Sequence, residues 1–148
     1  MEERNICKAV YEEIRSKYEI PEQITIKEPA DLLRVKGIVN ISGKKQEHFL
    51  VVTIDGGGNV IKCRTITKGL LNHSLVHPRE VYRDAILDSA HSIICVHNHP
   101  SGGLSPSNQD IQVTKQLKGA GEIIGISLLD HVIVSKTGIQ SMRSLGYI

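Results

Sequence analysis

Apolar and polar positions along the chain predict strands and helices in alternation. Two apolar runs flank a glycine-rich turn, and they predict a β-hairpin with strands at residues 47–55 and 60–67. A third apolar run, residues 93–96, is typical of a buried strand. Three further strands are expected at residues 23–26, 122–129 and 131–135.

Helical spacing of apolar positions predicts four helices, at residues 3–18, 29–33, 78–90 and 107–118. We expect Pro21 to close the first of them, and a glycine-rich stretch at residues 119–121 to end the last. One face of the helix at 78–90 is expected to pack on the sheet, and it carries Val81, Tyr82, Ala85, Ile86 and Ser89.

A chain of 148 residues favours one folded domain with a core that needs no crosslinks. We expect residues 1–22 to form a helical extension and residues 23–148 to form the domain. No apolar run is long enough to span a membrane, and the charged N-terminus does not resemble a signal peptide. The sequence therefore predicts a cytoplasmic protein that does not enter membranes.

Charge and composition narrow the function classes. The net charge of +2 is too small to indicate a nucleic-acid binder, and Phe49 with four tyrosines gives few side chains for stacking on bases. The three cysteines are widely spaced and include no Cys-x-x-Cys pair, so they do not suggest a disulfide framework or a thiolate zinc site.

The segment 97–110 carries the candidate chemistry. His97 and His99 are two residues apart after the buried strand, so both side chains lie on one face of an extended chain. A loop rich in proline and glycine follows, and Asp110 lies in the first turn of the next predicted helix. The three residues are expected to supply ligands to one zinc ion and to leave a coordination position for water.

The same residues have a simpler interpretation. A single histidine is more often a surface or hydrogen-bonded residue than a metal ligand. Ser107 and Asp110 also suit the N-cap and N3 positions of a helix, which favour a helix start without any metal. The local residues alone leave both interpretations open.

The spacing of this segment resembles a known family. His97-x-His99-Pro100 followed by Ser107-x-x-Asp110 is similar to the JAMM motif of the JAB/MPN-plus metalloproteases. The resemblance is to the RadC branch in particular, and it extends from about residue 32 to the C-terminus. The further segments that carry it are Gln46-Glu47-x-Phe49, Pro78-Arg79-Glu80 and Leu129-Asp130-His131.

The resemblance implies a fold and a set of roles. The fold is of the α/β class, an α+β sandwich of JAB1/MPN type, in which helices flank a mixed sheet and zinc lies between a strand end and a helix start. One Zn²⁺ per chain would be held by His97, His99 and Asp110. Glu47 would act as the general acid and base, and Ser107 would donate a hydrogen bond to the developing oxyanion. The substrate would be a peptide or isopeptide.

One departure from the family pattern concerns the residue between the two histidines. Many JAMM deubiquitinases have serine or threonine there, and this chain has Asn98. The RadC branch also carries a DNA-repair label. The alternative function is therefore a non-catalytic module that associates with DNA repair or binds a protein partner.

The pair Asp130-His131 has two interpretations. It would orient a metal ligand through a hydrogen bond, or it would hold two strands together, and the second role is preferred. His131 as a fourth protein ligand would indicate a structural zinc site, because structural sites usually have four such ligands.

Overall fold

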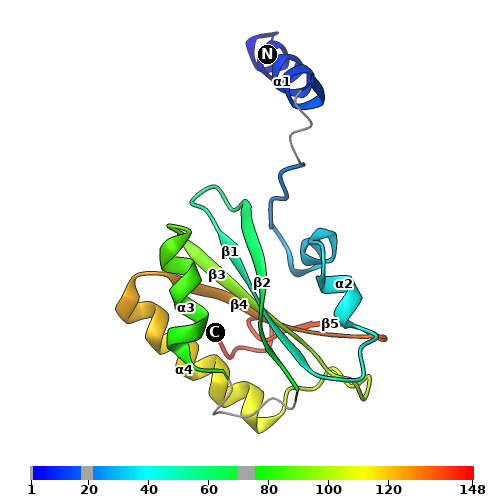
Figure 1. Ribbon diagram of the computed structural model, residues 1–148, viewed down its shortest axis with the longest axis vertical. Helices are drawn as coiled ribbons and strands as arrows, with labels where there is room; N and C mark the ends of the chain where they lie inside the picture. The colour runs from blue at the N-terminus through cyan, green and yellow to red at the C-terminus, as the bar shows by residue number, and fades with distance from the viewer. Residues whose placement is uncertain (1, 18–21, 70–75) are drawn as a thin grey trace.

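The computed structural model of the protein describes residues 2–17, 22–69 and 76–148, and a five-stranded mixed sheet lies at its centre (Figure 1). The strands are β1 (His48–Ile54), β2 (Val60–Lys68), β3 (Ser92–Asn98), β4 (Ser127–Ser135) and β5 (Gly138–Ser141). Their order in the sheet is β2-β1-β3-β4-β5. Only β3 and β4 pair in parallel, and the other three neighbouring pairs are antiparallel.

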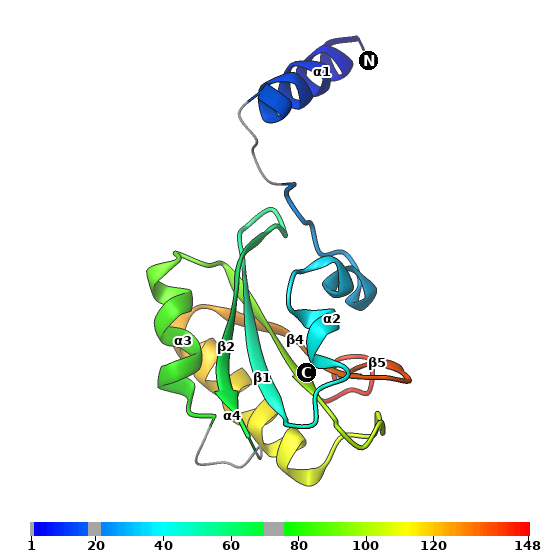
Figure 2. The same ribbon diagram turned by 45° about the vertical axis from the view of Figure 1, so that its right-hand side comes forward.

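Helices cover both faces of the sheet, because alternate residues of its central strands are apolar on each side. On one face, Phe49, Val51 and Cys95 join a core under α3 (Pro78–Leu87) and α4 (Asn108–Ile124). On the other face, Leu50 and Val96 join a second core. That core packs under the 3₁₀ helix η1 (Pro29–Arg34) and the short helix α2 (Ile38–Ile41). Figure 2 shows α3 and α4 on one side of the strands and α2 on the other.

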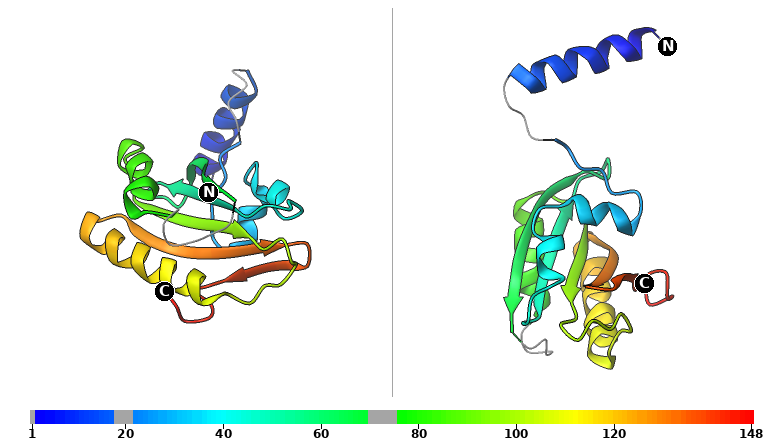
Figure 3. Two further views of the ribbon diagram at one scale, coloured as in Figure 1. Left: turned by 60° about the horizontal axis from the view of Figure 1, so that its bottom comes forward. Right: turned by 90° about the vertical axis from the view of Figure 1, so that its right-hand side faces the viewer.

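The parallel pair at the centre of the sheet determines where a site can form. β3 leads into a loop and then into α4, which returns along the sheet so that β4 can pair with β3 (Figure 3). The end of β3 therefore faces the start of α4. Ligand sites in such sheets lie at the carboxyl ends of parallel strands.

Several predicted elements are confirmed. The hairpin forms with the expected turn, and the short helix after residue 28 is η1, with Pro29 in its first turn. The first predicted helix is α1 (Glu2–Lys17), which covers neither face of the sheet in Figure 1. Its expected end at Tyr18 and Pro21, like the connector at residues 70–75 with His73, lies outside the described residues.

The region after residue 118 differs from the prediction. α4 does not end at residues 119–121 but continues to Ile124, where Gly125 adopts a left-handed conformation with φ of 84°. The strands expected at 122–129 and 131–135 are instead the last turn of α4 followed by the single strand β4. The glycines indicated a helix end, whereas one of them serves close packing, as described below.

Smaller differences occur elsewhere. The strand expected at 23–26 is only a single bridge between Thr25 and Asn59, and α2 was not predicted. α3 ends at Leu87, so Ser89 is exposed beyond the helix, and Ile86 points into solvent. Val81, Tyr82 and Ala85 are buried against the sheet as expected.

No helix among the described residues is long and apolar enough to cross a membrane.

Candidate metal centre

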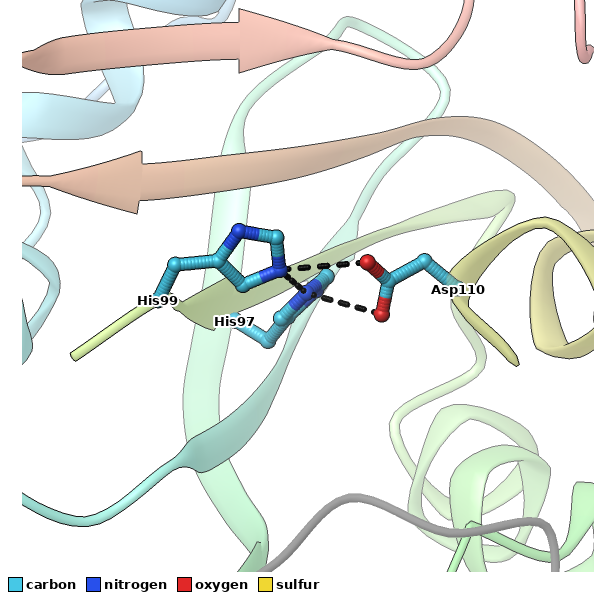
Figure 4. A group of neighbouring side chains, drawn as sticks. All are labelled: His97, His99 and Asp110. Atoms are coloured by element: carbon cyan, nitrogen blue, oxygen red, sulfur yellow. Dashed lines mark hydrogen bonds and ion pairs between the residues drawn. The ribbon is translucent and has the colours of Figure 1, made fainter. Parts of the chain in front are cut away.

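Three side chains that are predicted ligands meet where β3 ends and α4 begins (Figure 4). His97 is the second-to-last residue of β3, and His99 is the first residue after the strand. The two Nε2 atoms are 2.9 Å apart. The Nε2 atom of His97 is 3.1 Å from Asp110 Oδ1, and that of His99 is 3.1 Å from Asp110 Oδ2. Residues at i and i+2 thus share one face, as the spacing predicted.

The start of α4 holds Asp110 in place. Ser107 is the N-cap residue, and its Oγ accepts a hydrogen bond from the Asp110 backbone N–H at 3.1 Å. The Asp110 carboxylate accepts in turn from the Ser107 backbone N–H at 2.7 Å. This reciprocal capping box orients the carboxylate toward the histidines. The helix-start interpretation of these residues is therefore confirmed, and it does not compete with the metal interpretation.

Burial and charge set the ionisation of the group. His97 and Asp110 are almost completely buried, and His99 is partly exposed. Burial alone would raise the pKa of Asp110, but the imidazoles of His97 and His99 beside the carboxylate outweigh burial and hold that pKa far below its usual range. The hydrogen bond with Asp110 raises the pKa of His99. Asp110 is therefore a carboxylate anion at neutral pH.

The geometry fits a small divalent cation. With one oxygen of Asp110 as ligand, the three donor atoms lie within 4.8 Å of one another. Ligands at about 2.0–2.1 Å from a tetrahedral zinc would be about 3.4 Å apart, close to the separations of the two Nε2 atoms from each other and from the carboxylate. Within the part of the chain that the structure describes, no other cluster of His, Cys, Asp or Glu side chains offers three such donors. Two imidazoles and one carboxylate form a donor set typical of zinc.

A cleft opens beside the three side chains. Its volume is about 690 Å³, and His99 and Asp110 lie in its wall together with Glu47 and Ser107. Glu47 immediately precedes β1 and is partly exposed. The Ser107 hydroxyl oxygen accepts its capping hydrogen bond, which leaves the hydroxyl hydrogen able to donate toward the cleft. The structure therefore brings four of the five predicted site residues to one cleft, from the loop after β3, the start of α4 and the segment before β1. His97, the fifth, is buried beside His99 and Asp110.

Asn98 fixes the segment that carries Glu47. Its side chain lies on the opposite face of β3 from the two histidines and is completely buried. The Oδ1 atom accepts from the His48 backbone N–H at 2.6 Å, and the Nδ2 group donates to the Gln46 carbonyl at 3.0 Å. These are the backbone groups on either side of Glu47. The sequence indicated Asn98 only as a departure from the family pattern, and the register of a strand places it against this segment.

The pair Asp130-His131 divides its two predicted roles between its members. Asp130 accepts hydrogen bonds from the Ser141 hydroxyl at 2.5 Å and the Arg143 backbone N–H at 3.1 Å, and so ties β4 to the end of the chain. His131 instead contacts His97, with its Nε2 2.7 Å from His97 Nδ1. Complete burial lowers the pKa of His131 well below its usual value.

Thr114 is a residue of the site that the sequence reasoning missed. Its hydroxyl is 2.7 Å from His131 Nδ1. The signal was its spacing, because Thr114 follows Asp110 by four residues and therefore lies on the same face of α4.

Comparison with known proteins identifies the family. Residues 26–147 match the model of the RadC-like JAB domain. A UPF0758 protein of Methanospirillum hungatei is 57% identical over 139 residues, which cover 92% of this chain and 62% of that protein. A UPF0758 protein of Staphylococcus haemolyticus is 41% identical over 96% of this chain and 63% of its own length. One of Chlorobium luteolum is 53% identical over 70% of this chain and 46% of its own length. The chain thus spans less than two thirds of these relatives, and it belongs to the RadC-like JAB domain family.

Proposed function

We propose that this protein is a zinc-dependent hydrolase that cleaves a peptide or isopeptide amide bond. The observation that carries the proposal is the shared cleft. His99 and Asp110 line the same 690 Å³ cleft as Glu47 and Ser107, so a substrate bound in the cleft would lie beside all four residues. Membership of the JAB-domain family supports the same reaction class.

The number of donors supports catalysis over a purely structural metal. Structural zinc sites usually have four protein ligands, whereas catalytic sites have three and leave one position for water or substrate. Among the described residues, three side chains supply donors here. His131, the predicted candidate for a fourth ligand, contacts the Nδ1 atom of His97 and not the Nε2 atom that faces Asp110.

The residues divide the reaction between them. Zinc, when bound, would lower the pKa of a water molecule toward about 7 and polarise the scissile carbonyl. Glu47 takes a proton from the attacking water and later delivers it to the leaving amine. Ser107 donates its hydroxyl hydrogen to the carbonyl oxygen as negative charge develops there. Asn98 positions the Glu47 backbone through its neighbours on either side.

The metal is tested first, by elemental analysis of the purified protein. We expect about one zinc per chain in the wild type. The variants His99→Ala and Asp110→Ala should lose it, because each removes one of three donors. An exposed histidine, His91, provides the matched control, and His91→Ala should retain the metal. A wild type that binds no zinc after reconstitution would contradict the proposal and favour the non-catalytic alternative.

Turnover is tested with the zinc-loaded protein and a peptide and isopeptide library, with cleavage detected by mass spectrometry. Glu47→Gln keeps the shape of the side chain but cannot accept a proton, so it should retain zinc and lose at least about 100-fold in rate. Cleavage at equal rates by both proteins would show that Glu47 is not the general base, or that a contaminating protease is responsible.

A further inference from the structure

A buried series of hydrogen bonds reaches the Nδ1 side of the His97 ring, opposite the Nε2 atom that faces the Asp110 carboxylate. Thr114 of α4, His131 of β4 and His97 of β3 are all completely buried. The Thr114 hydroxyl lies 2.6 Å from the Asp110 carbonyl oxygen and 2.7 Å from His131 Nδ1, and His131 Nε2 lies 2.7 Å from His97 Nδ1. These hydrogen bonds thus link α4 through β4 to the His97 imidazole of β3.

The direction of every hydrogen bond in this series follows from the first one, between the Thr114 hydroxyl and the Asp110 carbonyl. A carbonyl oxygen only accepts, so the single hydroxyl hydrogen of Thr114 is donated to Asp110 O. The Thr114 oxygen must then accept from His131 Nδ1–H. A completely buried imidazole is neutral, because charging it would cost solvation, so the Nε2 atom of His131 carries a lone pair. That lone pair accepts from His97 Nδ1–H.

The consequence for His97 is a single tautomer. A ring that carries its proton on Nδ1 has its lone pair on Nε2, and Nε2 is the atom that faces His99 and Asp110. An imidazole with the proton on Nε2 could not bind a metal through that atom. The partner of the other ring nitrogen is what decides which nitrogen of a ligating histidine is free.

We propose that Thr114 and His131 are positioning residues that set the tautomer of His97 and thereby raise the affinity of the site for zinc. This inference rests on the proposed metal site. A merely structural role would differ in its consequence: removing the Thr114 hydroxyl would change the stability of the fold but not the position of the proton on His97.

The test compares three variants with the wild type. Thr114→Val removes the hydroxyl and keeps the shape, whereas Thr114→Ser keeps the hydroxyl. Thr53→Val is the matched control, because Thr53 is a buried threonine of β1 whose hydroxyl donates to Asp88 at 2.7 Å, outside the candidate metal centre. The zinc dissociation constant is measured by competition with a chelator. The His97 tautomer is measured by ¹H–¹⁵N NMR of the imidazole nitrogens in the metal-free protein.

We expect Thr114→Val to weaken zinc binding about 10- to 100-fold and to shift His97 away from the Nδ1–H form. Thr114→Ser and Thr53→Val should match the wild type in both measurements. The inference is overturned by a wild type whose His97 carries its proton on Nε2, or by Thr114→Val with unchanged tautomer and affinity. If the wild type bound no zinc, the proposed function would fail, while the NMR measurement would still decide the role of Thr114.

Discussion

Asn98 shows at the scale of one residue how a strand serves two purposes at once. His97 and His99 on either side of it point their imidazoles at Asp110, while the Asn98 side chain on the other face holds the backbone before β1. A side chain that accepts one backbone hydrogen bond and donates another in a buried setting fixes its partner segment firmly. The amide of Asn98 supplies both the acceptor and the donor that these two backbone groups need.

We predict that Asn98→Ala lowers the free energy of unfolding by about 1–3 kcal/mol, because the His48 N–H and the Gln46 carbonyl lose a buried partner. Zinc content should not change, since Asn98 faces away from the donors. Urea denaturation and elemental analysis measure the two effects. Asn108→Ala, at an exposed position in the first turn of α4, should change stability much less. Equal stability of Asn98→Ala and wild type would disprove the anchoring role.

At the scale of elements, α4 explains why a glycine-rich stretch lies inside a helix. A Cβ atom on Gly121 would lie 2.5 Å from the Tyr82 hydroxyl and 2.5 Å from the Ile126 carbonyl oxygen. Tyr82 of α3 needs that space, because its hydroxyl donates to the Leu117 carbonyl at 2.8 Å. Gly119, two residues earlier, has nothing within 4 Å of the same position. Close packing therefore requires glycine at position 121 but not at position 119.

This difference predicts opposite effects for the same substitution. Gly121→Ala gains about 1 kcal/mol of helix propensity, but crowding against Tyr82 and Ile126 should cost about 1–3 kcal/mol. A net loss of stability is expected. Gly119→Ala should stabilise the protein by up to about 1 kcal/mol, since only the propensity changes. Urea midpoints of both variants check this, and stabilisation by both would contradict the packing argument.

A second pair of elements is held by charge. Arg64 of β2 makes two hydrogen bonds to the Asp88 carboxylate just after α3, and one of them is 2.7 Å long. The Arg64 guanidinium holds the pKa of Asp88 below its usual value, although partial desolvation opposes the shift. A lowered pKa in the folded state adds stability that is complete above the unfolded pKa of about 3.9 and disappears as the pH falls through the folded value.

Asp88→Asn should therefore destabilise the protein at pH 7, and the difference from wild type should shrink as the pH falls below about 4. Urea unfolding at pH 7 and at pH 3 measures both differences. The exposed ion pair of Glu80 with Arg83 provides a control, because surface pairs contribute little. Glu80→Gln should thus have nearly the same stability as wild type at both pH values. A difference for Asp88→Asn that grows on acidification would reverse the sign and exclude this account.

At the scale of the whole molecule, short-range patterns were sufficient for much of the fold. The hairpin, β3 and the meeting of His97, His99 and Asp110 follow from spacing within one strand, one loop and one helix turn. The contributions of Thr114 and His131 depend on which elements lie side by side, and parallel pairing of β3 with β4 is a long-range property. For the same reason, the sequence predicted a helix end at residues 119–121, because the contact between Gly121 and Tyr82 of α3 is also long-range.

The residues proposed to bind the metal and the residue proposed to transfer the proton come from different segments of the chain. The donors lie within the fourteen residues from His97 to Asp110, whereas Glu47 reaches the cleft from the segment before β1, which the Asn98 side chain anchors. Under the proposed function, one substitution before β1 would turn the enzyme into a pseudoenzyme that keeps its ion and its fold. Relatives that differ in that segment alone would then share metal chemistry without sharing a reaction.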